Sequence, residues 1–222
     1  TPLYSSAASD VYKRQDLAQL TPAALAGLTK TNITGLDIAN LTGDNQFTAL
    51  TSTQIGLLST AQVPVITADQ AAVLTPTQAA GITAKQAPYI EASDLGAFSA
   101  KTFAALSADA VGALTDTGSG VSAQIQAITA EQAALMTTAQ AKALTGAVID
   151  SLSTDAFVAL SPAALAAIPA EAIDNVTATA FGNLSAAQVA AMTPAQFAVL
   201  TNTSGQLANF TSTQAAAITS AQ

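Results

Sequence analysis

Carboxylates are the side chains in this sequence with the clearest chemical potential. Paired Asp and Glu residues can act as general acid and base or can bind calcium. Here the acids stand singly, no Asp-x-Asp-x-Asp-Gly calcium loop is found, and there is no His or Cys to supply zinc ligands or a nucleophile–base pair. The acids considered are Asp44, Asp69, Asp109, Glu131, Asp155 and Glu171. We therefore expect no catalytic residue, no metal site, no cofactor and no enzyme activity.

Two other features could bind a ligand. The segment Asp116–Gly120 reads Asp-Thr-Gly-Ser-Gly, but it lacks the Lys and the spacing of a phosphate-binding loop. We expect a loop that interrupts a repeat. Tyr89 and Phe98 could stack against a ligand, yet one lies next to a repeating apolar position and the other occupies one. We expect both in the core.

An eight-residue repeat fills the chain from residue 16 onward. Each octad starts with an apolar anchor followed by Thr or Ser, and Gln often holds the fifth place. The regular anchors are Leu50, Leu58, Ile66, Leu74, Ile82, Ile90, Phe98, Leu106, Leu114, Ile128, Met136, Leu144, Leu152, Leu160, Ile168, Val176, Leu184, Met192 and Leu200. Irregular anchors precede them at Leu20, Leu28, Ile33 and Leu41, and Phe210 and Ile218 follow. The phase slips at Lys30–Asn32, Gly43–Asn45, Asp116–Gly120 and Asn202–Gly205, which we expect to be loops between stacked units.

The octad repeats a helix-start signature. A Thr or Ser followed three residues later by Gln is a capping box, in which each side chain satisfies the other's backbone N–H. Pro22, Pro76, Pro162 and Pro194 directly follow the hydroxyl residue, at the first helical position where Pro is favoured. Eight of the regular octads lack the Gln, with Asp94, Thr102, Ala110, Val148, Ala156, Ala164, Ala172 and Ala180 in its place.

These features predict an all-α solenoid of very short helices. One continuous helix is excluded because an eight-residue repeat displaces its apolar stripe by about 80° per octad. A β-solenoid with rows of Thr is the alternative, although places one and six have opposite strand parity. A single octad cannot fold alone, because ordering its backbone costs more than two buried side chains return. The octads must therefore stack, with Thr/Ser and Gln rows running along the coil.

The first fifteen residues resemble translated sequencing-adapter sequence. Residues 5–15 back-translate to the transposase adapter used in library preparation, and residues 1–4 fit an index flanked by primer. We expect residues 1–15 to be a disordered scar unrelated to the fold; a genuine polar tail is the alternative. Residues 16–222 would then be one octapeptide-repeat solenoid, cut in mid-octad at both ends and so a fragment of a longer array.

The charge balance limits the partners. Six basic and fourteen acidic residues give a net charge of −8, which disfavours nucleic acid and anionic membranes as partners. No apolar run approaches the ~20 residues of a membrane span.

The Leu-Thr-x-x-Gln octads over residues 16–222 resemble arrays in large secreted or surface-attached bacterial proteins, some of them adhesin-like. The resemblance implies an extracellular or cell-surface structural or adhesive segment, acting as a spacer or display surface. Its partners would be a surface glycan or other repeat segments of the same protein. The alternative function is a solenoid that binds ice or a glycan through ladders of Thr or Gln.

Overall fold

The protein is built from very short helices. The computed structural model describes residues 20–42, 45–115, 124–174, 176–200, 205–220 and 222, so the predicted scar at residues 1–15 lies outside the described residues. Within that part of the chain every α-helix has four to six residues, the other helices are single 3-10 turns, and no strand is present. The all-α prediction is thus confirmed over the described ranges, and the β-solenoid is excluded there.

The predicted caps start the helices. In the octad of Thr75, the backbone N–H of Gln78 donates to Thr75 Oγ1 (3.3 Å) and the N–H of Thr75 donates to Gln78 Oε1 (3.0 Å). The same complete box begins α4 (Ser52–Leu57), α5 (Ala68–Val73), α6 (Pro76–Ala79), α10 (Ala130–Ala134), α11 (Thr138–Lys142), α17 (Ala186–Ala191), α18 (Pro194–Val199) and α19 (Ser212–Ala217). Many of the helices end where the next anchor is extended, as at Leu58 with φ −57° and ψ 136°.

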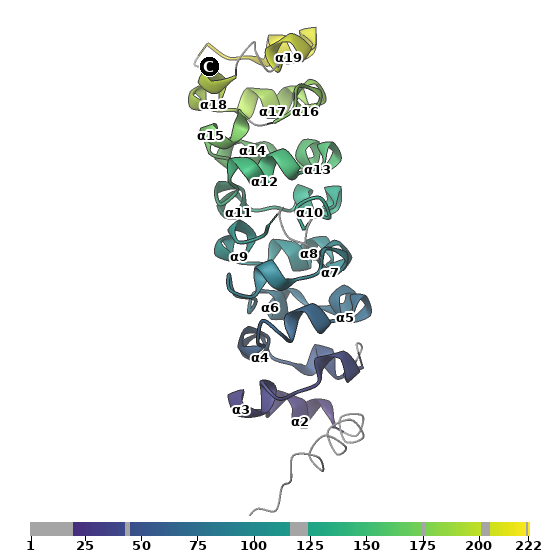
Figure 1. Cartoon of the computed structure of the whole chain (residues 1–222). Helices are drawn as coiled ribbons and strands as arrows, with labels where there is room; N and C mark the ends of the chain where they lie inside the picture. Colours follow the sequence, from purple (N-terminus) through teal and green to yellow (C-terminus); the bar gives the residue numbers. More distant parts are fainter. Residues whose placement is uncertain (1–19, 43–44, 116–123, 175, 201–204, 221) are drawn as a thin grey trace, which may run out of the picture.

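Three octads complete one turn of the solenoid. Each helix packs mainly on the helix three octads further along the chain, so the helices form three columns around a common core, and Figure 1 shows them stacked from the purple end to the yellow end. In the regular regions one coil therefore takes three octads of eight residues.

The columns are as follows. The first contains α2 (Pro22–Ala26), η2 (Phe47–Ala49), α5 (Ala68–Val73), α7 (Ala92–Ala97), a turn at residues 124–127, α12 (Gly146–Ser151), α15 (Ala170–Ile173) and α18 (Pro194–Val199). The second contains α3 (Lys30–Ile33), α4 (Ser52–Leu57), α6 (Pro76–Ala79), α8 (Ala100–Ala104), α10 (Ala130–Ala134), α13 (Thr154–Ala159), α16 (Ala178–Gly182) and η5 (Leu207–Asn209). The third contains η1 (Ile38–Asn40), η3 (Val63–Val65), η4 (Ala87–Tyr89), α9 (Ala108–Gly112), α11 (Thr138–Lys142), α14 (Pro162–Ala167), α17 (Ala186–Ala191) and α19 (Ser212–Ala217).

One continuous core runs through the coils. It is formed by the anchors and by the residues in the sixth place, and it includes the fully buried Phe47, Phe103, Phe157 and Phe181. Small residues let neighbouring coils approach closely. A Cβ on Gly81 would lie 2.0 Å from the carbonyl oxygen of Ser52 in the coil below, which no side chain could tolerate without a backbone shift.

One predicted loop is wrong. Lys30–Asn32 lies in helix α3, which Thr29 precedes as the N-cap residue in an extended conformation. The side chains of Thr29 and Asn32 hydrogen-bond to each other across the first turn. Asn32 stands in the fifth place, so this segment is an ordinary octad without Gln rather than a break in the repeat.

Candidate functional site

The Gln side chains connect successive coils. Gln78 accepts from its own cap through Oε1, while its Nε2 donates to the carbonyl oxygens of Phe47 (2.9 Å) and Leu50 (2.9 Å) in the coil below. Gln86 repeats the arrangement on Ile55 (2.7 Å) and Leu58 (2.9 Å). In most cases the acceptors are the sixth-place residue of one octad and the next anchor, although Gln188 uses Val158 and Leu160. We call this set of contacts the amide ladder.

The amide ladder lies inside the solenoid. Its buried members are Gln46, Gln54, Gln62, Gln70, Gln78, Gln86, Gln124, Gln132, Gln140, Gln188, Gln196, Gln206 and Gln214. A buried amide whose oxygen and nitrogen are both hydrogen-bonded avoids the desolvation penalty that an unpaired one incurs. These Gln side chains are enclosed rather than displayed at the surface, and their amides are hydrogen-bonded except for Gln206 Oε1, which has no partner among the described residues. The sequence predicts only the capping box, which is the bond from each Gln Oε1 to its own octad. It does not predict the bonds from Nε2 to the coil below.

The amide ladder also locates two of the phase slips. The N–H of Thr42 donates to Gln46 Oε1 (3.0 Å), and the N–H of Thr115 donates to Gln124 Oε1 (2.9 Å) across nine residues of sequence. The extra residues therefore lie inside an octad, between its hydroxyl and its Gln, and not between units as predicted. The Asp116–Gly120 segment falls in this insertion and lies outside the described residues.

The hydrogen bonds of Gln62 correct the predicted anchors of the first coil. Gln62 Nε2 donates to the carbonyl oxygens of Ile33 (2.8 Å) and Leu36 (2.9 Å). Ile33 is thus a sixth-place residue, and Leu36 is the anchor, in phase with Leu20 and Leu28. The irregularity lies in the shortened unit from Leu36 to Asn40, which forms only the 3-10 turn η1.

Two of the regular octads have another polar residue in the fifth place instead of Gln. These residues are Asp94 and Thr102. Thr102 Oγ1 donates to the carbonyl oxygen of Leu74 (2.8 Å) and so keeps one of the two contacts with the coil below. Asp94 is only 4% exposed, and its Oδ2 has no hydrogen-bond partner. Burial, reinforced by the nearby charge of Glu91 and opposed by a hydrogen bond from Ser93, raises the pKa of Asp94 to about 6.

Asp94 borders an internal cavity of about 20 Å³. The cavity lining is apolar except for Gln86 and Asp94, and it includes Val63, Ile66 and Phe98. A space of this size holds about one water molecule and is far smaller than the ~300–1,000 Å³ of pockets for organic ligands. The cavity is a packing defect beside a buried acid rather than a substrate pocket.

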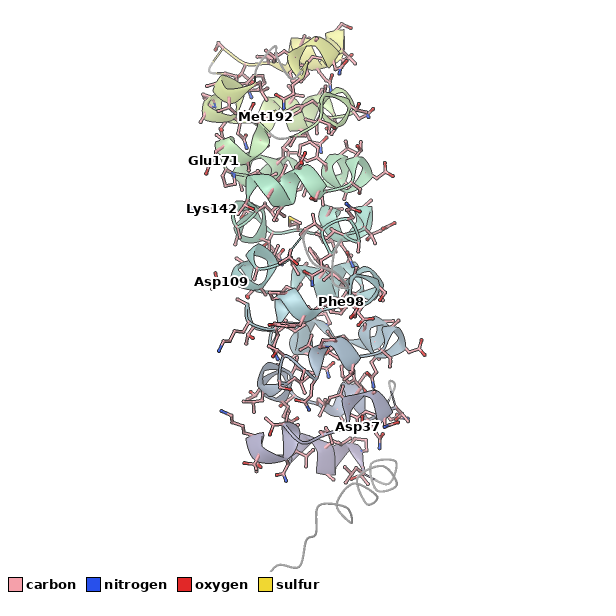
Figure 2. All side chains as sticks on the ribbon, viewed as in Figure 1. Asp37, Phe98, Asp109, Lys142, Glu171 and Met192 are labelled. Carbon is pink, nitrogen blue, oxygen red and sulfur yellow. The ribbon has the colours of Figure 1, made fainter. Side chains whose placement is uncertain are left out.

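The other acids do not converge on a site. Asp69, Asp109, Glu131, Asp155 and Glu171 are exposed in the first turns of their helices, where the helix dipole favours negative charge. Figure 2 shows Asp109 and Glu171 on separate levels of the stack. Within the described ranges no three acidic residues come together as metal ligands, and Asp44 lies outside those ranges.

The two aromatic residues considered as stacking groups differ in their exposure. Phe98 is buried in the core, as predicted, and is labelled in Figure 2. Tyr89 is 44% exposed, so its predicted core position is wrong. Tyr89 is the last residue of the 3-10 turn η4 and stands in the eighth place of its octad. At this place the side chain points away from the core, whereas the next residue, the anchor Ile90, is buried.

The Thr and Ser caps remain near the surface, but most of their oxygens are occupied by backbone N–H groups, as at Thr51, Thr75 and Thr137. The ice-binding alternative required flat rows of Thr on strands, and the described residues form none.

The comparisons with other proteins give no further assignment: no family model, no curated protein and no solved structure matches this chain. Among the described residues, no helix is long and apolar enough to cross a membrane.

Proposed function

We propose that the chain is a non-catalytic structural or adhesive repeat segment, a spacer or display surface of a larger extracellular bacterial protein. The observation that carries the proposal is the amide ladder, which bonds coil to coil over most of the described length. Polar bonding and apolar packing are both directed inward, so the interior is used for cohesion and the surface is left for display.

The display surface follows from the octad. The fourth place is exposed and carries charges of either sign, while in most octads the fifth and sixth places are buried. The fourth-place charges are Asp69, Lys85, Lys101, Asp109, Glu131, Asp155 and Glu171. Surface residues can therefore vary from octad to octad without disturbing the interior, which suits a segment that presents side chains along its length.

Small-angle X-ray scattering tests the spacer role. Removing residues 144–167 deletes three octads, one coil, and joins Ala143 to Ile168 in phase. Because packed helices lie about 8–10 Å apart, we expect the maximum dimension to fall by about that distance. A particle that keeps its length, or that becomes unfolded, would count against a rod in which each stacked coil adds the same length.

The adhesive and extracellular parts rest on the resemblance of the octads to surface-protein arrays. A glycan array probed with the folded chain tests adhesion, and antibody labelling of intact cells of the natural source tests location. Labelling only after permeabilisation would refute the extracellular assignment without affecting the spacer role.

A further inference from the structure

The octad from Ile90 to Ala97 carries acids at both places that define the repeat. Glu91 stands in the hydroxyl place, and α7 begins without a side-chain cap. Asp94 stands in the Gln place and is buried. Within the regular octads from residue 50 to 114, it is the one acid at a fifth place. This octad therefore lacks both the capping box and the amide that joins its coil to the coil below.

The register identifies what Asp94 faces. Gln86, one octad earlier, contacts the carbonyl oxygens of Ile55 and Leu58, and Thr102, one octad later, contacts that of Leu74. Adding eight residues to the first pair gives Val63 and Ile66, and subtracting eight from Leu74 gives Ile66 again. Val63, Ile66 and Asp94 all line the same cavity. Asp94 thus occupies the position from which Gln would donate to two carbonyls.

An ionised carboxylate cannot make those contacts. It only accepts hydrogen bonds, and so do the two carbonyl oxygens. The other polar side chain in the cavity lining, Gln86, is already committed to Thr83, Ile55 and Leu58. A protonated carboxyl, in contrast, has an O–H that can donate to one carbonyl, as the hydroxyl of Thr102 does.

We propose that Asp94 is a proton-operated joint between its own octad, residues 90–97, and residues 63–66 of the coil below, closed when its carboxyl is protonated and loosened when it is ionised. A proton is the cation that suits this site, because one carboxylate in an apolar cavity of about 20 Å³ offers no metal its usual set of oxygen ligands. The joint concerns the cohesion of two coils and stands whether or not the chain is a spacer.

The charged surroundings agree with this assignment. The raised pKa of Asp94 is caused first by burial and second by Glu91, with Ser93 opposing. The helix packed below, α5, carries one titratable group, Asp69, which is exposed. The turn at residues 124–127 above α7 carries none. No basic group lines the cavity to stabilise the ionised form.

Because the folded pKa of about 6 exceeds the unfolded value of 3.8, the stabilisation is complete below about pH 4 and is lost as the pH rises through 6. Carbon-13 NMR of the Asp94 carboxyl should give a midpoint near 6. Hydrogen exchange at residues 63–66 and 91–98, corrected for intrinsic rates, should show an opening constant that rises about 10-fold between pH 5 and pH 7.5.

Asp94→Gln restores the amide and should abolish this pH dependence while tightening the segment at pH 7.5. The matched control is Asp109→Asn, an exposed fourth-place acid, which should retain the wild-type dependence. A midpoint near 4, or an unchanged pH dependence in Asp94→Gln, would overturn the proposal. So would protection of the segment by millimolar calcium at pH 7.5, which would indicate a metal site instead.

Discussion

Two regions of the solenoid hold their coils together by different means. From residue 66 to 89, three successive octads place Gln70, Gln78 and Gln86 in the amide ladder, and each Gln is followed by Ala. From residue 144 to 183, five successive octads lack Gln, and their fifth places are Val148, Ala156, Ala164, Ala172 and Ala180. The sixth places of that second region, which we call the apolar belt, are Ile149, Phe157, Leu165, Ile173 and Phe181, all buried.

The comparison shows that a hydrogen-bonded Gln in the fifth place can be replaced by a larger apolar side chain in the sixth place. Two net hydrogen bonds contribute about 1–3 kcal/mol, and burying one Leu, Ile or Phe side chain contributes about 1.5–3 kcal/mol. The two solutions are of similar strength, so the same backbone coil accepts either. Beyond the two regions the exchange holds in one direction only. Asp94, Thr102 and Ala110 precede the large residues Leu95, Phe103 and Val111. Gln54, Gln62 and Gln196 nevertheless also precede large residues, so an octad can combine both means.

The largest expected effect is a truncation in the apolar belt. Phe181 is fully buried, and its ring centroid lies 6.0 Å from that of Phe157 and 6.2 Å from that of Phe210. Phe181→Ala should reduce the local free energy of opening by about 3–5 kcal/mol, measured by native-state hydrogen exchange on α16. The control is Phe197→Ala, a half-buried ring, which should cost less. Equal losses would mean that the belt has no special dependence on its sixth places.

A truncation in the amide ladder comes next. Gln78→Ala removes donors from the carbonyls of Phe47 and Leu50 and leaves Ala79 beside the void. We expect a loss of about 2–4 kcal/mol, because buried acceptors become unsatisfied and volume is lost as well. Thr77→Ala, at the exposed neighbouring position, should change little. If both variants unfold at the same urea concentration as wild type, the amide ladder does not hold the coils together.

The smallest expected effect compares one capped and one uncapped hydroxyl, one from each region. Thr75 accepts from the N–H of Gln78, whereas Thr145, which precedes α12 in the apolar belt, makes no side-chain cap bond. Thr75→Ala should cost about 1 kcal/mol, and Thr145→Ala should cost almost nothing, by the same exchange measurement. Similar losses at both positions would show that the hydroxyl acts by something other than capping.

Much of the local structure follows from the sequence, because capping acts within four residues. The Thr–Gln pairs predict where helices start, and the extended anchors stop them one or two turns later. The three-octad coil could not be predicted, since the partners of Gln78 lie 28 and 31 residues away and every octad resembles the next. Ile33 was mistaken for an anchor because sixth-place residues in octads without Gln are as large as anchors.

The candidate site shows the same division. The departure of Asp94 from the Gln pattern was visible in the sequence, but its burial beside the cavity depends on the coil below. One signal for the coil contacts was also present: every regular octad without Gln has a large apolar residue in the sixth place, whereas octads with Gln have either Ala or a large apolar residue there. That correlation arises because both residues face the same neighbouring coil.

The exchange between amide and apolar side chain can be tested by converting one octad of the apolar belt into a ladder octad. Ala180→Gln combined with Phe181→Ala would place an amide where the register offers the carbonyl oxygens of Ile149 and Leu152. We predict that hydrogen exchange on α13 and α16 will show the double variant recovering at least half of the stability that Phe181→Ala loses. A double variant no more stable than Phe181→Ala alone would contradict the account.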